Sequence, residues 1–265
     1  MAPLLKEERQ ELILNMLRDS RQVTVGELSD RFDVSEVTIR RDLSELAEHG
    51  YVKRAHGGAI ATPIGPTTSP VIRRMNCQRQ YKEAIGRAAA KLVQDGDTIF
   101  LGAGSTTAHV ARQLVHHKDL TVVTNALNIA NEFSSTEKVT VVVTGGILHK
   151  PELSLIGHIA NQALGEVLVD KVIIAIPAIS LETGLTNDYL PEVMTDRAIL
   201  EMSKELIVVA DATKFGKVES ALVAPLQRIT TLVTDDRIEE RLLENLKDLV
   251  NQVIVVETEK AKPTI

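Results

Sequence analysis

The chain has 265 residues, of which 44% are hydrophobic and 25% charged, and its formal net charge is -6. These proportions are typical of globular proteins and exclude a largely disordered or collagen-like chain, and the length favours one large domain or two unequal ones. A single cysteine, Cys77, excludes an internal disulfide or a multi-thiolate metal site. Because no signal peptide or membrane-spanning run is visible, we expect a cytoplasmic protein with no membrane partner.

Three short helices and a hairpin are predicted in the first 61 residues. Apolar residues recur at helical spacing in each of the three helical segments, and Thr24 and Ser35 are suitable N-caps for the second and third. Extended runs around two glycines predict the hairpin. In chain order, these elements span 6–18, 25–32, 35–49 and 51–60.

The third helix is predicted to have one apolar and one DNA-contacting face. Ile39, Leu43, Leu46 and Ala47 fall together on a helical wheel and would face a core. On the opposite side, arginines can pair with guanine, small apolar groups can touch a thymine methyl, and a hydroxyl can hold a phosphate. Glu45 and Glu48 would repel the DNA backbone, so only the N-terminal half is expected in the groove. The predicted contacts are Ser35, Val37, Thr38, Arg40, Arg41 and Ser44.

The hairpin supplies cations beside this helix. Lys53, Arg54 and His56 lie where the wing of a winged helix-turn-helix touches flanking phosphates or the minor groove. Residues 1–61 contain nine Lys and Arg against eleven Asp and Glu, so a basic face would be a local arrangement. A three-helix protein-protein module with solvated arginines is the alternative interpretation of these residues.

One motif in this region is the run VSEVTIRRDL at 34–43, followed by Leu46, Gly50 and the run RAHGGA at 54–59. It resembles the signature of the DeoR family of bacterial transcriptional regulators. The helix motif, the following glycine and the wing stand at the family's spacing. The resemblance implies that residues 1–61 form a DNA-binding domain.

Residues 62–76 are predicted to link this domain to a second one over 77–265, because prolines and a glycine at 63–70 disfavour both helix and sheet. Beyond the linker, a helix is expected over 79–93. It is followed by β-type runs at 98–101, 120–124, 139–144, 171–176, 206–210, 231–234 and 253–255. Because these runs alternate with helical segments, the fold class expected is α/β, with an N-terminal winged helix-turn-helix joined to a mostly parallel α/β sensor domain.

A glycine-containing loop follows the first of these strands and opens a helix. Backbone amides and hydroxyls in such a loop can surround an anion at the positive end of the helix dipole. The loop is neither a dinucleotide fingerprint nor a P-loop, and glycines at a strand-to-helix turn also occur for steric reasons alone. The residues of this predicted phosphate cradle are Gly102, Ala103, Gly104, Ser105, Thr106 and Thr107.

Three further strand ends are expected at the same edge of the sheet, where ligands bind in parallel α/β folds. They contribute Asn125, the pair Gly145 and Gly146, and Lys214. Small residues, amides and one cation suit a small phosphorylated, hydroxyl-rich molecule, and Lys214 would neutralise its charge. Each loop taken alone is also compatible with a simple turn.

The DeoR resemblance extends over this half of the chain, as far as the run VAPL at 223–226. It implies a domain similar to ribose-5-phosphate isomerase that senses a sugar phosphate or a related metabolite. Two departures stand out: Gly102 stands where the family often has Asp, and AIPA at 175–178 where it often has Gly-Ala-Asp-Gly. Both departures remove carboxylates that would contact ligand hydroxyls, so the effector need not be one of the family's usual ones.

The function expected is that of a sugar-phosphate-responsive repressor of carbohydrate genes, which binds double-stranded operator DNA as a homodimer or homotetramer. An isomerase-like enzyme is the alternative. It would need a carboxylate near the sugar carbons to act as a base. Pro177 cannot supply one, so the possible bases are Asp188, Glu192 and Asp211. The histidines at 109, 116, 117, 149 and 158 follow no metal-ligand pattern and are given no role, so we expect no enzyme, cofactor or metal.

Overall fold

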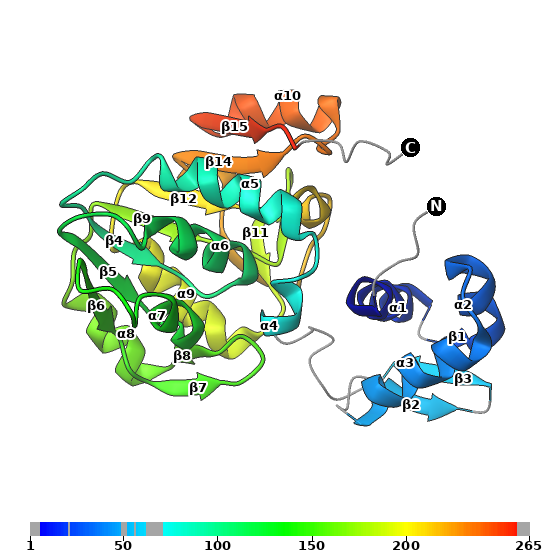
Figure 1. Ribbon diagram of the computed structural model, residues 1–265. Helices are drawn as coiled ribbons and strands as arrows, with labels where there is room; N and C mark the ends of the chain where they lie inside the picture. The colour runs from blue at the N-terminus through cyan, green and yellow to red at the C-terminus, as the bar shows by residue number, and fades with distance from the viewer. Residues whose placement is uncertain (1–5, 21, 49–51, 56, 62–70, 259–265) are drawn as a thin grey trace, which may run out of the picture. The chain divides into compact units, whose positions relative to one another are not determined.

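The computed structural model describes residues 6–20, 22–48, 52–55, 57–61 and 71–258. The chain divides into two compact units, residues 1–77 and 78–265 (Figure 1). The predicted linker, 62–76, lies partly outside the described residues, and its described part includes the short helix α4, Val71–Arg74.

The described part of the first unit before α4 contains three helices and a small antiparallel sheet. The sheet has the strand order β1-β3-β2, so the predicted hairpin of β2 and β3 is confirmed, while β1 was not predicted. The first helix was predicted to end at Arg18 and runs two residues farther. In chain order the elements are α1 (Lys6–Ser20), β1 (Gln22–Thr24), α2 (Val25–Phe32), α3 (Glu36–Glu48), β2 (Val52–Ala55) and β3 (Gly58–Ala61).

Local chemistry fixes the beginning of α2 and the approach of β1 to β3. The Thr24 hydroxyl accepts a hydrogen bond from the Glu27 amide, and the Glu27 carboxylate accepts one from the Thr24 amide, which makes a capping box. At Gly58 a Cβ would lie 2.0 Å from the Val23 carbonyl oxygen, so only glycine lets the two strands pair here. Both features hold the wing sheet against the helices.

The second unit is built on a seven-stranded parallel sheet with the order β15-β14-β12-β9-β4-β5-β6. All seven predicted β-type runs are strands of this sheet, so the predicted fold class is confirmed. The strands are β4 (Thr98–Leu101), β5 (Leu120–Thr124), β6 (Val139–Val143), β9 (Lys171–Ile174), β12 (Leu206–Val209), β14 (Thr231–Asp235) and β15 (Gln252–Val256).

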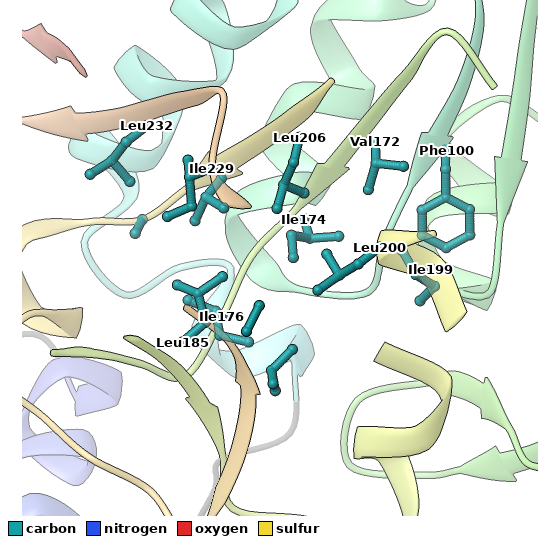
Figure 2. Packing of buried hydrophobic residues seen from close by; sticks show 14 of the residues in the cluster. Phe100, Val172, Ile174, Ile176, Leu185, Ile199, Leu200, Leu206, Ile229 and Leu232 are labelled. Atoms are coloured by element: carbon teal, nitrogen blue, oxygen red, sulfur yellow. The ribbon is translucent and has the colours of Figure 1, made fainter. Parts of the chain in front are cut away.

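Helices cover both faces of this sheet. One face is covered by α5 (Arg79–Ala90), α6 (Ser105–Leu114) and α7 (Leu127–Glu132), of which α5 and α6 pack closely against each other. Residues of α8 (His158–Gly165), α9 (Leu190–Leu200) and α10 (Glu240–Leu249) join the apolar core on the other face. Figure 2 shows that core, in which Phe100, Val172 and Leu206 of the strands lie near Ile199 and Leu200 of α9. Successive strand residues point to opposite faces, which explains why the strands are apolar throughout.

In the described part of the second unit, five short strands lie outside the main sheet, and none of these five was predicted. One pair forms an antiparallel hairpin, and the other three form a small antiparallel sheet with the order β10-β11-β13. Their bounds are β7 (Ile147–His149), β8 (Ser154–Ile156), β10 (Ala178–Ser180), β11 (Gly184–Asn187) and β13 (Ala221–Ala224). Within the parts of the chain that are described, no helix combines the length and apolar character that a membrane crossing requires.

Candidate functional site

The outer face of α3 is polar and largely exposed, whereas its inner face is buried. Ile39, Leu43 and Leu46 are fully buried, as the wheel predicted. On the other side, 75% of Val37 is exposed, as is 83% of the Arg41 side chain. The Arg41 guanidinium has Glu45 as its nearest acid, at 3.9 Å, so it is not tightly paired. This face offers a cation and an apolar group at the same end of the helix.

Other predicted contacts on α3 are engaged within the helix. The Ser35 hydroxyl accepts from the Thr38 amide at 3.2 Å and lies 2.9 Å from the Thr38 hydroxyl, so it caps the helix. Arg40 Nη2 lies 2.8 Å from the Glu36 carboxylate, and the Ser44 hydroxyl donates to the Arg40 carbonyl. The predicted set therefore lies together on α3, and Arg41 is its least constrained cation.

Two acids of α3 face α1, and sequence reasoning did not foresee this. Asp42 is buried and accepts a hydrogen bond from Arg9 Nε at 2.6 Å. Glu45 lies 2.6 Å from Lys6 Nζ and accepts from Gln10, and the Lys6 ammonium holds the pKa of Glu45 below its usual value. Because Glu45 turns toward α1, it presents less negative charge to the outer face than the sequence suggested.

The wing places two cations on β2. Lys53 and Arg54 are exposed, and neither forms an ion pair with any residue that the structure describes. Adjacent strand residues point to opposite faces, so the two cations diverge. Strand β2 packs against α3 in the same unit. His56, the third predicted wing contact, lies outside the described residues.

In the second unit, the predicted phosphate cradle leads from β4 into α6. Ser105, Thr106 and Thr107 form the buried first turn of α6, and amides at this position have no acceptor within a helix. Gly104 has φ +147°, and a Cβ there would lie 2.9 Å from the Ala175 Cβ. The Gly102 amide already donates to the Ile173 carbonyl, so it belongs to the sheet and not to the nest of amides.

Two other predicted loops lie at neighbouring strand ends, because β4, β5 and β6 are adjacent and parallel. Asn125 follows β5 and is buried, with its Nδ2 donating to the Leu155 carbonyl and its Oδ1 without a partner among the described residues. Gly145 and Gly146 follow β6 with φ of +72° and +123°. These loops and the phosphate cradle therefore share one edge of the sheet.

Lys214 lies farther along the same edge, after β12, which β9 separates from β4. Its neighbour is Asp211: burial disfavours the Asp211 carboxylate, but the Lys214 and Lys82 ammonium groups outweigh burial and lower its pKa. Lys82 of α5 is only 3% exposed, and no pattern in the sequence distinguishes it from an ordinary surface lysine. The positive charge of Lys214 at this edge is therefore partly balanced by the negative charge of Asp211.

A buried polar cluster beside β8 was not predicted as a unit. Ser154 donates to Glu192 Oε1 at 2.6 Å, and Asn187 Nδ2 donates to Asp196 Oδ2 at 2.7 Å and lies 3.4 Å from Glu192 Oε2. His149 Nδ1 lies 3.8 Å from Glu192 Oε2. We call these five residues the acid-amide cluster. Glu192 was considered only as a possible base, and His149 was given no role.

The two acids of the acid-amide cluster differ in their tendency to ionise. They stand four residues apart on α9 and therefore share one helix face. Burial favours neutral Glu192, but the His149 ring and the Ser154 hydroxyl beside it keep its pKa below the usual value. Burial and the Glu192 carboxylate together raise the pKa of Asp196 to about 8. One negative charge is therefore favoured here over two.

These two units define a class of protein: a transcriptional regulator with a DNA-binding helix-turn-helix and a separate sensor domain. The family models agree. The DeoR-like helix-turn-helix domain matches residues 9–63, and the DeoR C-terminal sensor domain matches residues 77–236. The chain belongs to the DeoR family of transcriptional regulators.

Curated relatives align over nearly the whole chain. The uncharacterized HTH-type transcriptional regulator YgbI of Escherichia coli K12 is 35% identical over 88% of this chain and 91% of its own length. The putative aga operon transcriptional repressor of Escherichia coli O157:H7 is 34% identical over 94% and 93%. The glycerol-3-phosphate regulon repressor of Escherichia coli K12 is 33% identical over 86% and 90%.

Solved structures give a weaker match. Ribose 5-phosphate isomerase A from Methanocaldococcus jannaschii is 19% identical with a TM-score of 0.38, over 52% of this chain and 54% of that chain. The aligned region is about half of each protein. A similarity this low has no bearing on activity.

Proposed function

We propose that this regulator represses carbohydrate genes by binding operator DNA through α3 and β2, and that a phosphorylated sugar bound in the second unit controls the binding. The observation that carries the proposal is the exposed outer face of α3, on which Val37 and the Arg41 side chain are solvent-exposed. Strand β2, which carries the exposed Lys53 and Arg54, packs against the same helix. Relatives named as repressors of the glycerol-3-phosphate regulon and the aga operon support the direction of control.

In the proposed complex, the first half of α3 enters the major groove. Arg41 would pair with guanine O6 and N7, and Val37 would touch a thymine methyl. Lys53 and Arg54 would contact phosphates, which position the protein without reading sequence. Ser35, Thr38 and Ser44 would add contacts at the edge of the helix, and Arg40 would have to leave Glu36 to join them.

The proposed effector site is the sheet edge formed by the ends of β4, β5 and β6. The phosphate would occupy the amide nest at Ser105, Thr106 and Thr107, where the dipole of α6 favours an anion. The rest of the site would be lined by Ala103, Asn125, Gly145 and Gly146. Lys214 would attract the phosphate, although the Asp211 carboxylate beside it offsets part of that attraction. Gly102 would shape the turn through its backbone.

Ligand binding would act on DNA binding by favouring one arrangement of the two units over another, which is the only way a ligand can shift such an equilibrium. We propose a homodimer or homotetramer, because two helix-turn-helix heads match the two half-sites of a pseudo-palindromic operator. The protein would act in the cytoplasm, where bacterial DNA lies.

The experiment is a fluorescence-anisotropy titration at 150 mM salt with a duplex from the region upstream of the protein's own gene. The proposal expects binding roughly a thousandfold or more tighter than to a scrambled duplex. Glycerol 3-phosphate, ribose 5-phosphate and glucitol 6-phosphate are then added, and one of them is expected to weaken binding while its 31P spectrum stays unchanged. Equal affinity for both duplexes, or consumption of the sugar phosphate, would overturn the proposal.

A further inference from the structure

Buried atoms at and beside the acid-amide cluster have unused hydrogen-bonding capacity. Oδ1 of Asn125 and both amide atoms of Asn128 have no hydrogen-bond partner among the described residues, and Nδ1 of His149 lies 3.8 Å from Glu192 Oε2, beyond hydrogen-bond distance. The His149 side chain is only 10% exposed and is stacked on Tyr189, with ring centroids 4.1 Å apart. Buried polar atoms in native proteins nearly always have a partner, so these atoms point to a bound molecule.

The acid-amide cluster lies close to the proposed phosphate site. The Leu155 amide donates to the Asn125 carbonyl at 2.6 Å, and Ala126 forms a β-bridge with Ser154. Strand β8 therefore runs beside the end of β5, and β5 is the neighbour of β4 in the sheet. Two strand spacings, about 10 Å, separate the amide nest of α6 from Ser154. A phosphorylated molecule of several carbons can span that distance.

The chemistry of the cluster favours hydroxyl groups over a carboxylate. Glu192 and Asp196 offer carboxyl oxygens that accept hydrogen bonds, and Asn187 is held in place because its Oδ1 accepts from the Tyr189 amide. Burial and the Glu192 carboxylate together raise the pKa of Asp196, so a second negative charge is unfavourable in this buried position beside Glu192. A carboxylate on a ligand would meet the same repulsion.

Building on the proposed function, we propose that the acid-amide cluster binds the end of the effector remote from its phosphate and selects hydroxyl groups there. The effector is then a phosphorylated neutral sugar or polyol, and phosphorylated sugar acids are rejected. Glu192 and Asp196 would supply the carboxylates that are missing at Gly102 and Pro177. This assignment gives the cluster a role in specificity in addition to linking β8, β11 and α9.

The test compares matched pairs of ligands that differ only in replacing a terminal hydroxyl or aldehyde carbon by a carboxylate. The pairs are glycerol 3-phosphate and 3-phosphoglycerate, ribose 5-phosphate and 5-phosphoribonate, and glucitol 6-phosphate and 6-phosphogluconate. Each is titrated into the full-length protein bound to labelled promoter duplex. In the pair whose length fits, the neutral member is expected to release DNA at a concentration about tenfold or more lower than the acid.

Two variants assign the selectivity to the cluster. Glu192→Gln removes the ionised carboxylate and is expected to narrow the gap between the concentrations at which the two ligands of a pair release DNA. Glu201→Gln removes an exposed acid just after α9 and should leave that gap unchanged. Thermal melts identify a variant that fails to fold. The comparison of neutral and acid ligands on wild type does not depend on the variants. An acid that acts at the same or lower concentration than its neutral partner overturns this inference alone. No response to any pair overturns the proposed function as well.

Discussion

Arg9 Nε lies 2.6 Å from Asp42 Oδ2, and both side chains are almost completely buried between α1 and α3. This ion pair joins residues 33 positions apart and ties the outward-facing helix to the first helix of the chain. Because Asp42 and Arg41 are adjacent on α3, the orientation of the exposed guanidinium depends on a buried contact that it does not itself make.

Replacing Asp42 by alanine should destabilise the first unit, because it removes the carboxylate that forms an ion pair with the buried Arg9 guanidinium. Breaking a buried ion pair costs about 3–5 kcal/mol. Hydrogen exchange measured by mass spectrometry on segments 6–20 and 36–48 should become roughly a hundredfold faster or more. Glu45→Gln is the matched control: its carboxylate is partly solvated, so the change should be much smaller. Equal exchange in Asp42→Ala and wild type would contradict the structural role of the pair.

Arg41→Ala should weaken operator binding by about 1–3 kcal/mol and relax sequence preference at one base pair. Lys53→Ala should instead weaken binding to all duplexes similarly and reduce the slope of log affinity against log salt by about one. Anisotropy titrations with operator and scrambled duplexes at several salt concentrations separate the two effects. Arg87→Ala, an exposed arginine on α5, is the control and should change neither quantity. An unchanged sequence preference in Arg41→Ala would contradict the assignment of base reading to this residue.

The stability contribution of Asp196 should depend on pH. Its pKa is about 8 in the folded protein and 3.8 ordinarily, so between these values the unfolded chain releases a proton that the folded chain keeps. Folding stability from this group therefore falls as pH rises through that window. The lowered pKa of Glu192 acts in the opposite direction, but its effect is confined to lower pH.

Asp196→Asn removes this dependence while keeping an oxygen that can accept from Asn187. The variant should melt at a higher temperature relative to wild type at pH 8.5 than at pH 5. Thermal unfolding followed by circular dichroism at both values measures the difference. If the difference in melting temperature between variant and wild type were the same at both pH values, or larger at pH 5, Asp196 would ionise freely in the folded state.

Ser105→Asp tests the amide nest of α6. A carboxylate in the first turn interacts favourably with the helix dipole, by about 0.3–1 kcal/mol at exposed positions, and this offsets part of the cost of burying its charge at Ser105. The variant should therefore fold with a stability at or somewhat below that of wild type. The same charge should exclude a phosphate. Differential scanning fluorimetry with ribose 5-phosphate and inorganic phosphate should show a stabilising shift in wild type that is lost in this variant. Ser135→Asp adds the same charge at an exposed turn and should retain the shift.

The main sheet was predictable because its strands are rich in β-branched and apolar residues, and central strands such as β12 (Leu206–Val209) are apolar throughout and buried on both faces. The short strands were not predictable, because segments of three or four residues such as Ile147–His149 carry too little periodicity. Tertiary contacts account for these strands: β7 exists because it pairs with β8.

Where the predicted site residues are continuous in the chain, they lie at the beginnings of α3 and α6, but their roles remain predictions. The acid-amide cluster was not predictable, since His149, Ser154, Asn187 and Glu192 come from four separate elements that the fold brings together. The hydrogen-bond and ion-pair partners of individual side chains also could not be predicted from the sequence. Glu45 faces Lys6 and not DNA, and the Ser35 hydroxyl is used by Thr38.

The most direct test of the account is the ratio of operator affinities with and without a saturating sugar phosphate, measured on wild type and on Ser105→Asp. The account predicts that wild type binds operator about 5- to 150-fold more weakly when the sugar phosphate is present, the usual range of allosteric coupling. Ser105→Asp should bind operator as wild type does without ligand and show a ratio of one. An unchanged affinity of wild type across the whole neutral panel, or an equal ratio in both proteins, would contradict it.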